Sequence, residues 1–308
     1  MGFFRGNLKR ILIVFNPRSS KRDLIQAEVF AQARELKGWL VGKFEVSREN
    51  VDENAVRLAE MIKDGDLVVV AGGDGTAAVG VNAVTIAQKK AVLGVLGYGN
   101  FNDTAEMFLG GDLKEIVEKF EAGQMEDFYP LRVEVDGRFW RYAAGYVTIG
   151  MFAESTEVFN SEKVRKKLQI RGGRANFSYW SLAKWYFLNR KRKFLGEFKL
   201  NGEDVVKNTT DYVAVNGLRV AKVMKGGKWF LMKERFLSGS FALGGVFSLG
   251  KFMFRSIFFG ISGKESRGDV IEFLEPSEVE IHAEGEYMRL KDVRKIEVGK
   301  GNAIKIIA

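Results

Sequence analysis

The stretch Leu67–Ala83, LVVVAGGDGTAAVGVNA, decides the fold of this chain. It opens with a short, valine-rich apolar run, which is typical of a buried parallel strand. Three glycines then surround Asp74, and small apolar residues at helical spacing follow Thr76. The stretch therefore predicts a strand, a glycine turn and a helix in succession.

The glycine turn has the features of a phosphate-binding loop. Glycines allow positive φ angles and let a phosphate approach the backbone amides, and the helix N-terminus adds partial positive charge. We expect Thr76 to cap the helix and to touch a phosphate. A carboxylate beside a polyphosphate is repelled unless a cation lies between them, so Asp74 predicts Mg²⁺. A tight turn with a capping threonine and no ligand is the alternative interpretation.

Composition excludes several classes of chemistry. The 308 residues are enough for two domains. The absence of cysteine excludes disulfides, thiolate metal sites and cysteine nucleophiles, and a single histidine, His282, argues against a histidine-based triad or zinc site. The net charge of +9 favours acidic partners, namely a nucleotide, a nucleic acid or an anionic membrane. No window reaches about 20 uninterrupted apolar residues, so we expect no transmembrane helix and a cytoplasmic location.

The first half of the chain alternates between strand and helix patterns. Strands are expected at Arg10–Phe15, Lys43–Ser47, Leu67–Val70 and Ala91–Leu96, and helices at Asp23–Leu40, Asn50–Ile62, Thr104–Leu109 and Leu113–Ala122. This alternation predicts a parallel α/β sheet with its ligand at the C-terminal ends of the strands. Polar turns follow three of the strands, at Asn16–Ser20, Gly72–Thr76 and Gly97–Asp103, so all three turns are expected to meet at one crevice.

From about Tyr129 the pattern changes to short strands. Two alternating runs flank Asp136-Gly137, which is a hairpin signal. Further strands are expected at Tyr212–Val215, Phe241–Val246, Val279–Ala283 and Ile304–Ile307. We therefore expect an α/β nucleotide-binding domain at 1–128 and an antiparallel β domain for the substrate at 129–294, with residues from about 295 to 308 as candidates to pack back on the first domain.

Four motifs of this chain resemble the motifs of one family and follow the same order along the sequence. GGDGT (Gly72–Thr76) resembles the nucleotide loop of diacylglycerol, sphingosine and NAD kinases and, as GGDGS, of phosphofructokinases. NPRSS (Asn16–Ser20) resembles the NPxSG loop of the diacylglycerol kinase catalytic family, and GYGNFNDTA (Gly97–Ala105) resembles its PxGTxNDFA segment. EGE (Glu284–Glu286) resembles its DGE. Order and spacing fit along nearly the whole chain, so the chain resembles bacterial lipid kinases of this family.

The resemblance implies a fold and an activity. The fold would be an N-terminal α/β parallel sheet, as in NAD kinases and diacylglycerol kinases, followed by a C-terminal antiparallel β-sandwich. The activity would be ATP-dependent transfer of the γ-phosphate to the hydroxyl of a diacylglycerol-like membrane lipid, with Mg²⁺, in the cleft between the domains. Phosphoryl transfer needs positioning, charge neutralisation and a carboxylate near the attacking hydroxyl.

The resemblance also assigns roles to individual residues. The nucleotide and its phosphates would be held by Asn16, Pro17, Ser19, Gly72, Gly73, Asp74, Gly75, Thr76, Gly99 and Asn102. Asp74 and Asp103 would lie near the metal ion. Glu284 would be the catalytic base that accepts the proton of the lipid hydroxyl, Glu286 would sit beside it, and Asp74 would complete the catalytic group.

The chain also departs from the family pattern. Gly97, Asn100, Ser20 and Glu284 stand where the family has proline, threonine, glycine and aspartate, and Ser238 stands where an aspartate would supply a structural Mg²⁺ site. Two alternatives therefore stay open. One is a kinase of a soluble acceptor such as NAD, and the other is a membrane-binding pseudokinase that binds ATP without transferring phosphate.

A basic, aromatic segment points to a membrane surface. Lys163–Lys193 contains eleven lysines and arginines, no Asp or Glu, and interleaved Phe, Tyr and Trp. This composition suits peripheral docking on an anionic bilayer, and the Phe-rich stretch Phe247–Phe259 could help to admit an acyl chain. A solvated charged face over core aromatics is the alternative. No nucleic acid is expected as a partner, and the sequence leaves a homodimer open.

Overall fold

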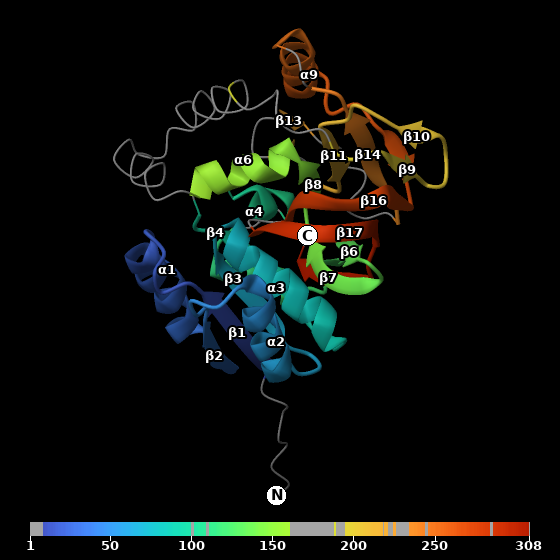
Figure 1. The fold of residues 1–308 in the computed structure, drawn as a ribbon. Helices are drawn as coiled ribbons and strands as arrows, with labels where there is room; N and C mark the ends of the chain where they lie inside the picture. The colour runs from blue at the N-terminus through green and yellow to red at the C-terminus, as the bar shows by residue number, and fades with distance from the viewer. Residues whose placement is uncertain are drawn as a thin grey trace, which may run out of the picture. The chain divides into compact units, whose positions relative to one another are not determined.

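The computed structural model describes residues 9–99, 102–108, 111–160, 188, 195–217, 219–220, 224–225, 234–243, 246–283 and 286–307 (Figure 1). The chain divides into two compact units. The first unit comprises Met1–Pro130 with Asn302–Ala308, and the second comprises Leu131–Gly301.

The first unit contains a six-stranded sheet of order β2-β1-β3-β4-β18-β5. Its strands are β1 (Lys9–Phe15), β2 (Trp39–Glu45), β3 (Leu67–Gly72), β4 (Val92–Gly97), β5 (Met125–Phe128) and β18 (Ile304–Ile307). Its helices are α1 (Arg22–Glu35), α2 (Val51–Met61), α3 (Asp74–Ala87), α4 (Asp103–Met107) and α5 (Leu113–Glu121). Strands β1 to β4 are parallel to their neighbours, and β18 joins the sheet parallel to β4 and antiparallel to β5.

The middle of this sheet is completely covered. Every residue of β3 is buried, as expected of a parallel strand with helices on both faces. The prediction of a single helix over Asp23–Leu40 is wrong beyond Glu35, because the apolar spacing continues into the next strand. The C-cap residue Leu36 is already extended, with φ −72° and ψ 90°. Gly38 then has a left-handed φ of 82°, and Leu40 belongs to β2.

The second unit is built on one continuous antiparallel sheet. Its main path is β15-β14-β11-β8-β16-β17-β6-β7, with β9 and β10 attached to β16. The strands are β6 (Leu131–Val135), β7 (Arg138–Ala143), β8 (Tyr146–Gly150), β9 (Phe198–Leu200), β10 (Val205–Val206), β11 (Asp211–Val215), β14 (Phe236–Phe241), β15 (Lys264–Ser266), β16 (Gly268–Ala283) and β17 (Glu286–Lys300). A small ribbon of β12 (Arg219–Val220) and β13 (Met224–Lys225) and the helices α6 (Met151–Asn160) and α9 (Val246–Phe258) complete the unit.

The sheet of the second unit encloses its own core. Side chains from β6, β7, β8, β11, β14, β16 and β17 pack in one apolar cluster, so the two halves of the sheet act as the two layers of a sandwich. The pairing of β16 with β17 shifts register between Glu272 and Val279. Pro276 lies in this interval and has no N–H to donate, which accounts for the irregular pairing.

Two strand predictions in this unit have opposite outcomes. The hairpin at Asp136-Gly137 is confirmed, and both residues have positive φ, 50° and 74°, as a type I′ turn requires. The strand predicted at Phe241–Val246 is wrong, because β14 ends at Phe241 and α9 begins at Val246. In the part of the chain that the structure describes, no helix, α9 included, is long and apolar enough to cross a bilayer.

Candidate nucleotide site

Three loops follow the adjacent parallel strands β1, β3 and β4, so they emerge at the same edge of the first sheet. In the β3–α3 loop the helix begins earlier than expected. Gly73 is the N-cap residue of α3, and no side chain caps it. The prediction that Thr76 caps the helix is therefore wrong. Thr76 is buried, and its N–H donates to the carbonyl of Gly73 at 2.9 Å.

Close packing explains two glycines of this edge. A Cβ on Gly99 would lie 2.3 Å from the Cα of Gly73, and a Cβ on Gly73 would lie 2.9 Å from the Cα of Gly99. Both distances are below those of real contacts, so the β3–α3 and β4–α4 loops touch through their backbones. The N–H of Tyr98 donates to the carbonyl of Gly72 at 2.9 Å and extends the pairing of β3 with β4. The two loops therefore form one rigid edge with exposed backbone at Gly75.

Asp74 joins this edge to helix α4. Its Oδ1 accepts the backbone N–H of Thr104 at 2.9 Å. Helix α4 has no capping side chain at its own N-cap residue, Asn102, so Asp74 supplies the acceptor that the free N–H groups of a helix N-terminus need. This carboxylate sits in the first turn of α3 and at the start of α4, where the partial positive charge of two helices stabilises it.

Asn102 holds the β4–α4 loop in shape. Its Oδ1 accepts the N–H of Gly99 at 2.6 Å, and its Nδ2 donates to the carbonyl of Gly97 at 3.2 Å. Its φ of 58° is in the left-handed region, which asparagine tolerates better than most residues. Asn102 therefore positions the glycines of this loop. The structure describes the backbone of Asp103 but not its side chain, and Asn100 lies outside the described residues.

The β1–α1 loop is a compact polar turn. The Oδ1 of Asn16 accepts the N–H of Arg18 at 2.9 Å, and its carbonyl accepts the N–H of Ser19 at 3.0 Å. Pro17 fixes the intervening φ. Ser19 Oγ accepts the N–H of Lys21 at 3.2 Å, and Lys21 Nζ donates to the carbonyl of Gly99 at 3.1 Å. Lys21 thus joins the first loop to the third and brings a positive charge to this edge.

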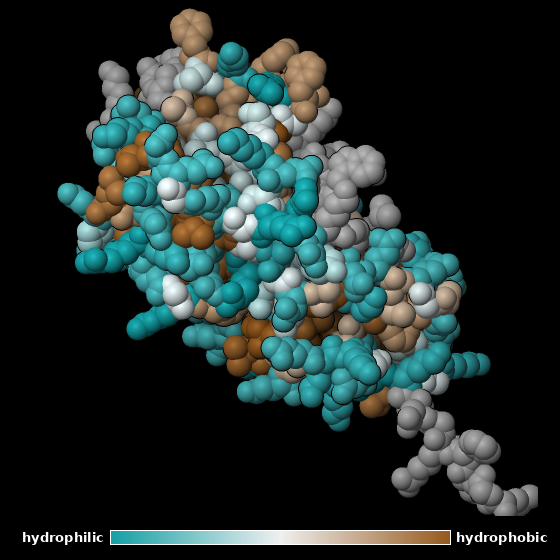
Figure 2. Space-filling model, turned by 90° about the vertical axis from the view of Figure 1, so that its right-hand side faces the viewer, coloured by the Kyte–Doolittle hydropathy of each residue, from teal (hydrophilic) through white to brown (hydrophobic). Residues whose placement is uncertain are grey.

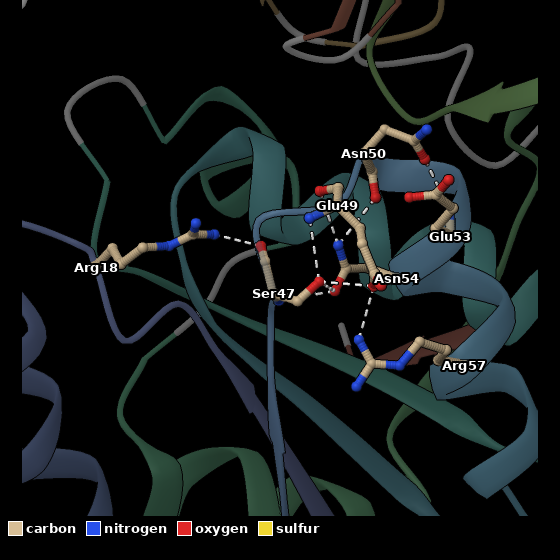
Figure 3. A network of polar contacts seen from close by, with 7 residues as sticks. All are labelled: Arg18, Ser47, Glu49, Asn50, Glu53, Asn54 and Arg57. Atoms are coloured by element: carbon tan, nitrogen blue, oxygen red, sulfur yellow. Dashed lines mark hydrogen bonds and ion pairs between the residues drawn. The ribbon is translucent and has the colours of Figure 1, made fainter.

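A polar network fixes the neighbouring β2–α2 connection (Figure 3). At its centre, Asn54 is fully buried and accepts the N–H of Ser47 at 2.8 Å. Asn54 also donates to the carbonyls of Glu49 and Asn50, at 3.0 and 2.9 Å. The guanidinium of Arg18 donates to the carbonyl of Ser47. Since Arg18 belongs to the β1–α1 loop, the network holds this connection beside the candidate nucleotide site.

Asp74 is the candidate ligand for Mg²⁺ at the same edge. Among the described residues, no three His, Asp or Glu side chains gather closely enough to hold a metal ion. Mg²⁺ is commonly held by one or two carboxylates together with substrate phosphates and water. Asp74 is half-buried and has the oxygen ligands that this ion prefers, so its donor set fits such a shared site. The second predicted ligand, Asp103, is known here by its backbone alone.

The predicted catalytic carboxylates belong to the second unit. Glu286 is the first residue of β17 and pairs with Ala283, the last residue of β16. Glu286 is half-buried. Glu284, the predicted base, lies in the connection between these strands and outside the described residues, as do the membrane-facing candidates 163–187 and 189–193. Of that basic segment, the structure describes only Leu188, which is exposed.

His282, one position before Ala283, is an interior residue of β16. It is buried, and its ring lies 5.5 Å from that of Tyr146, centroid to centroid. Burial, and to a smaller extent the charge of the buried Arg141, lowers the pKa of His282 to about 3. The imidazole is therefore neutral at physiological pH, and His282 is a core residue of this strand.

Sequence reasoning missed two lysines. Lys21 follows the NPRSS motif directly, so its place beside a phosphate loop was a signal in the sequence. Lys300, at the end of β17, gave no such signal. Its Nζ donates to the side-chain oxygen of the buried Asn216, and burial lowers the pKa of Lys300 to about 7. Only its burial in the fold distinguishes Lys300 from the other lysines and arginines of the chain.

Residues 10–133 match the model of the diacylglycerol kinase catalytic domain. This match covers the three loops described above. Residues 10–133 therefore belong to the diacylglycerol kinase catalytic domain family. No curated protein matches the sequence.

Solved structures show the fold of the whole chain. A candidate diacylglycerol kinase from Bacillus anthracis str. Sterne aligns with a TM-score of 0.67 at 15% identity, over 98% of this chain and 97% of that one. A diacylglycerol kinase from the same strain aligns with a TM-score of 0.64 at 12% identity over the same shares. An NAD kinase from Archaeoglobus fulgidus in complex with ATP gives a TM-score of 0.49 at 12% identity, over 97% and 93%. The predicted two-part fold of the diacylglycerol kinase family is confirmed.

Proposed function

We propose that this member of the diacylglycerol kinase catalytic domain family is an ATP-dependent lipid kinase, which transfers the γ-phosphate to the hydroxyl of a diacylglycerol-like membrane lipid. The observation that carries the proposal is the edge at Gly73, Asp74 and Gly99, where two loops touch backbone to backbone and present a helix N-terminus. Exposed amides at such a helix start bind phosphates. Lys21 adds a cation to the same edge.

The proposed chemistry divides between the two units. The first unit holds ATP, with Gly75 exposed for a close approach of the phosphates. When bound, Mg²⁺ at Asp74 supplies neutralisation of the phosphate charge. In the second unit, Glu284 accepts the proton of the lipid hydroxyl while the hydroxyl oxygen bonds to the γ-phosphorus and the bond to ADP breaks. Glu286, two positions further along the chain, is the second carboxylate of this proposed catalytic group. Docking of the basic segment Lys163–Lys193 on an anionic membrane belongs to the same proposal.

The test is transfer of labelled γ-phosphate from ATP, with Mg²⁺, to a total lipid extract, followed by chromatography of the lipids. Asp74→Asn is the informative variant, because an amide oxygen can still accept the N–H of Thr104 while the negative charge is lost. We expect a labelled lipid with the natural protein and none with Asp74→Asn. Asp23→Asn, an exposed carboxylate of α1, is the matched control and should leave transfer unchanged.

Other outcomes separate the competing functions. Glu284→Gln with unchanged turnover would remove the assigned base. Formation of NADP without lipid would assign the chain to a soluble acceptor. ATP binding and vesicle binding with no transfer to any acceptor would identify a pseudokinase, in which Asp74 serves only as the cap of α4.

A further inference from the structure

Helix α9 is attached to the second unit by one face. Leu249, Phe252 and Ser256 recur at the spacing of one side of a helix and are buried or half-buried. The ring of Phe252 lies 4.7 Å from that of Phe241 and 5.6 Å from that of Phe152, centroid to centroid. These residues belong to an apolar cluster with parts of β8, β11 and α6. The inner face of α9 is therefore fixed.

The opposite face of α9 is also apolar, but it is exposed. Phe247, Phe254 and Phe258 are 94%, 60% and 58% exposed, and Phe259, which follows the helix, is 79% exposed. The rings of Phe254 and Phe258 lie 4.8 Å apart, so they form a continuous aromatic surface. Figure 2 shows apolar side chains standing out at the top of the view, where Figure 1 has α9 of the second unit. We call Phe247, Phe254, Phe258 and Phe259 the aromatic face.

This clustering sets α9 apart from the other described elements. Large exposed apolar side chains elsewhere occur singly on several elements, for example Leu24 on α1 and Leu40 on β2. Single exposed apolar residues are ordinary, whereas a contiguous apolar patch marks an interaction site. The aromatic face therefore has the features of an interaction surface.

The charges around the aromatic face indicate the kind of partner. Lys251 and Arg255 lie on the exposed side of α9, and no Asp or Glu occurs between Phe241 and Lys264. In a two-fold symmetric contact with a second copy, these cations would face one another without any acid from the helix. Phosphates of an anionic bilayer complement them, and phenylalanines beside basic residues suit the interface of such a bilayer.

We propose that α9 lies flat in the interface of an anionic bilayer, with the aromatic face inserted and with Lys251 and Arg255 at the lipid phosphates. A helix of 13 residues is about 20 Å long, too short to span a bilayer but suited to lie in its surface. The inference rests on the proposed function, because a kinase whose acceptor lies in a membrane has to reach that surface. It adds a docking element separate from the segment Lys163–Lys193.

The test is flotation of the full chain, without ATP, with vesicles of phosphatidylcholine alone or mixed with an equal amount of phosphatidylglycerol. Phe247→Gln combined with Phe258→Gln should weaken binding to the mixed vesicles by about tenfold for each phenylalanine. Phe139→Gln, at an exposed phenylalanine of β7, is the matched control and should bind normally. Lys251→Gln combined with Arg255→Gln should weaken binding about fivefold for each charge at low salt and reduce its salt dependence.

Unfolding midpoints of all variants show whether they are folded, and Phe254→Trp gives a second measurement in a folded protein. A blue shift of its fluorescence on mixed vesicles supports insertion, and an unchanged spectrum overturns it. Equal vesicle binding by the double phenylalanine variant also overturns the proposal. The proposal is likewise overturned if the natural protein binds no vesicles but forms a dimer, and the double phenylalanine variant no longer forms that dimer.

Transfer to lipid in detergent micelles separates this inference from the proposed function. A protein that phosphorylates micellar lipid but does not bind vesicles retains the kinase proposal and loses the docking surface. A protein that docks through the aromatic face but transfers no phosphate supports the docking surface and refutes the kinase proposal.

Discussion

Helices α3 and α9 are both apolar around most of their circumference, but only α3 is covered by its own unit. From Thr76 to Thr85 every residue of α3 is buried, and the helix packs against α2, β3 and β4. Its small side chains and glycines let these neighbours approach closely. Helix α9 carries phenylalanines instead, and those on its outer side are exposed. An apolar helix therefore indicates a core only where neighbouring elements cover all of its sides. Where one apolar side stays exposed, the helix indicates a surface for a partner.

The largest expected effect is a loss of stability at acidic pH in the part of the second unit on which α9 packs. Tyr146 packs in the cluster that holds α9 and contacts the ring of His282. Because the pKa of His282 is lowered from 6.5 to about 3, the folded state binds fewer protons than the unfolded state between these values. The free energy of unfolding should therefore fall as the pH decreases through this window, by about 1.4 kcal/mol per pH unit.

Urea unfolding and hydrogen exchange from pH 6.5 downwards measure this effect. His282→Gln should flatten the pH dependence relative to the natural protein. As the pH falls, the backbone amides of α9, β8 and β16 should lose their protection from hydrogen exchange before those of α3, because the unit that contains α3 has no histidine. An identical pH dependence in the variant would show that other groups destabilise the protein in acid.

The next effect concerns the loop at the start of α3. In Gly99→Ala the new Cβ would lie 2.3 Å from the Cα of Gly73, so the two loops must separate. Displacements of about 1 Å at such sites lower rates by about 10²-fold. We expect that loss in phosphate transfer and a matching loss in ATP affinity, measured by calorimetry.

Gly75→Ala is the informative companion of this variant. A Cβ at Gly75 meets no atom within 4 Å, so the variant should fold normally. Normal folding with reduced ATP affinity would show that the nucleotide approaches this backbone. Full ATP affinity in Gly99→Ala would contradict the assignment of the site to this edge.

A smaller effect is expected within α3 itself. A Cβ on Gly80 would lie 2.3 Å from Cγ2 of Val70 and 3.3 Å from Cδ1 of Leu93. These atoms belong to completely buried side chains, so Gly80→Ala should destabilise the first unit by about 1–3 kcal/mol. The midpoint of urea unfolding checks this. An unchanged midpoint would mean that α3 is packed less tightly than its burial indicates.

How far the sequence could predict the molecule also differs between the two helices. The strand, glycine turn and helix around Asp74 are a local pattern, so the order of elements could be inferred from residues 67–83. The role of Asp74 as the cap of α4 could not, because Thr104 is 30 positions away and approaches only through the fold. The strand predicted at Phe241–Val246 overlaps α9 only at Val246. The Phe-rich pattern of Phe247–Phe259 did not show which side of the helix is covered, because that depends on the tertiary packing of Phe252. The low pKa of Lys300 likewise arises from burial that no local pattern records.

The smallest effect is the sharpest test of the difference between the helices. Gly250, in α9, is the counterpart of Gly80, but a Cβ there meets no atom within 4 Å. Because glycine is a poorer helix former than alanine, Gly250→Ala should stabilise the protein by about 0.5–1 kcal/mol, opposite in sign to Gly80→Ala. The midpoint of urea unfolding should rise, and vesicle binding should not change, since the aromatic face is intact. A lower midpoint would mean that another part of the chain covers the outer side of α9. The phenylalanines would then belong to the interior of the protein, as the apolar side chains of α3 do, and would not be available to a membrane.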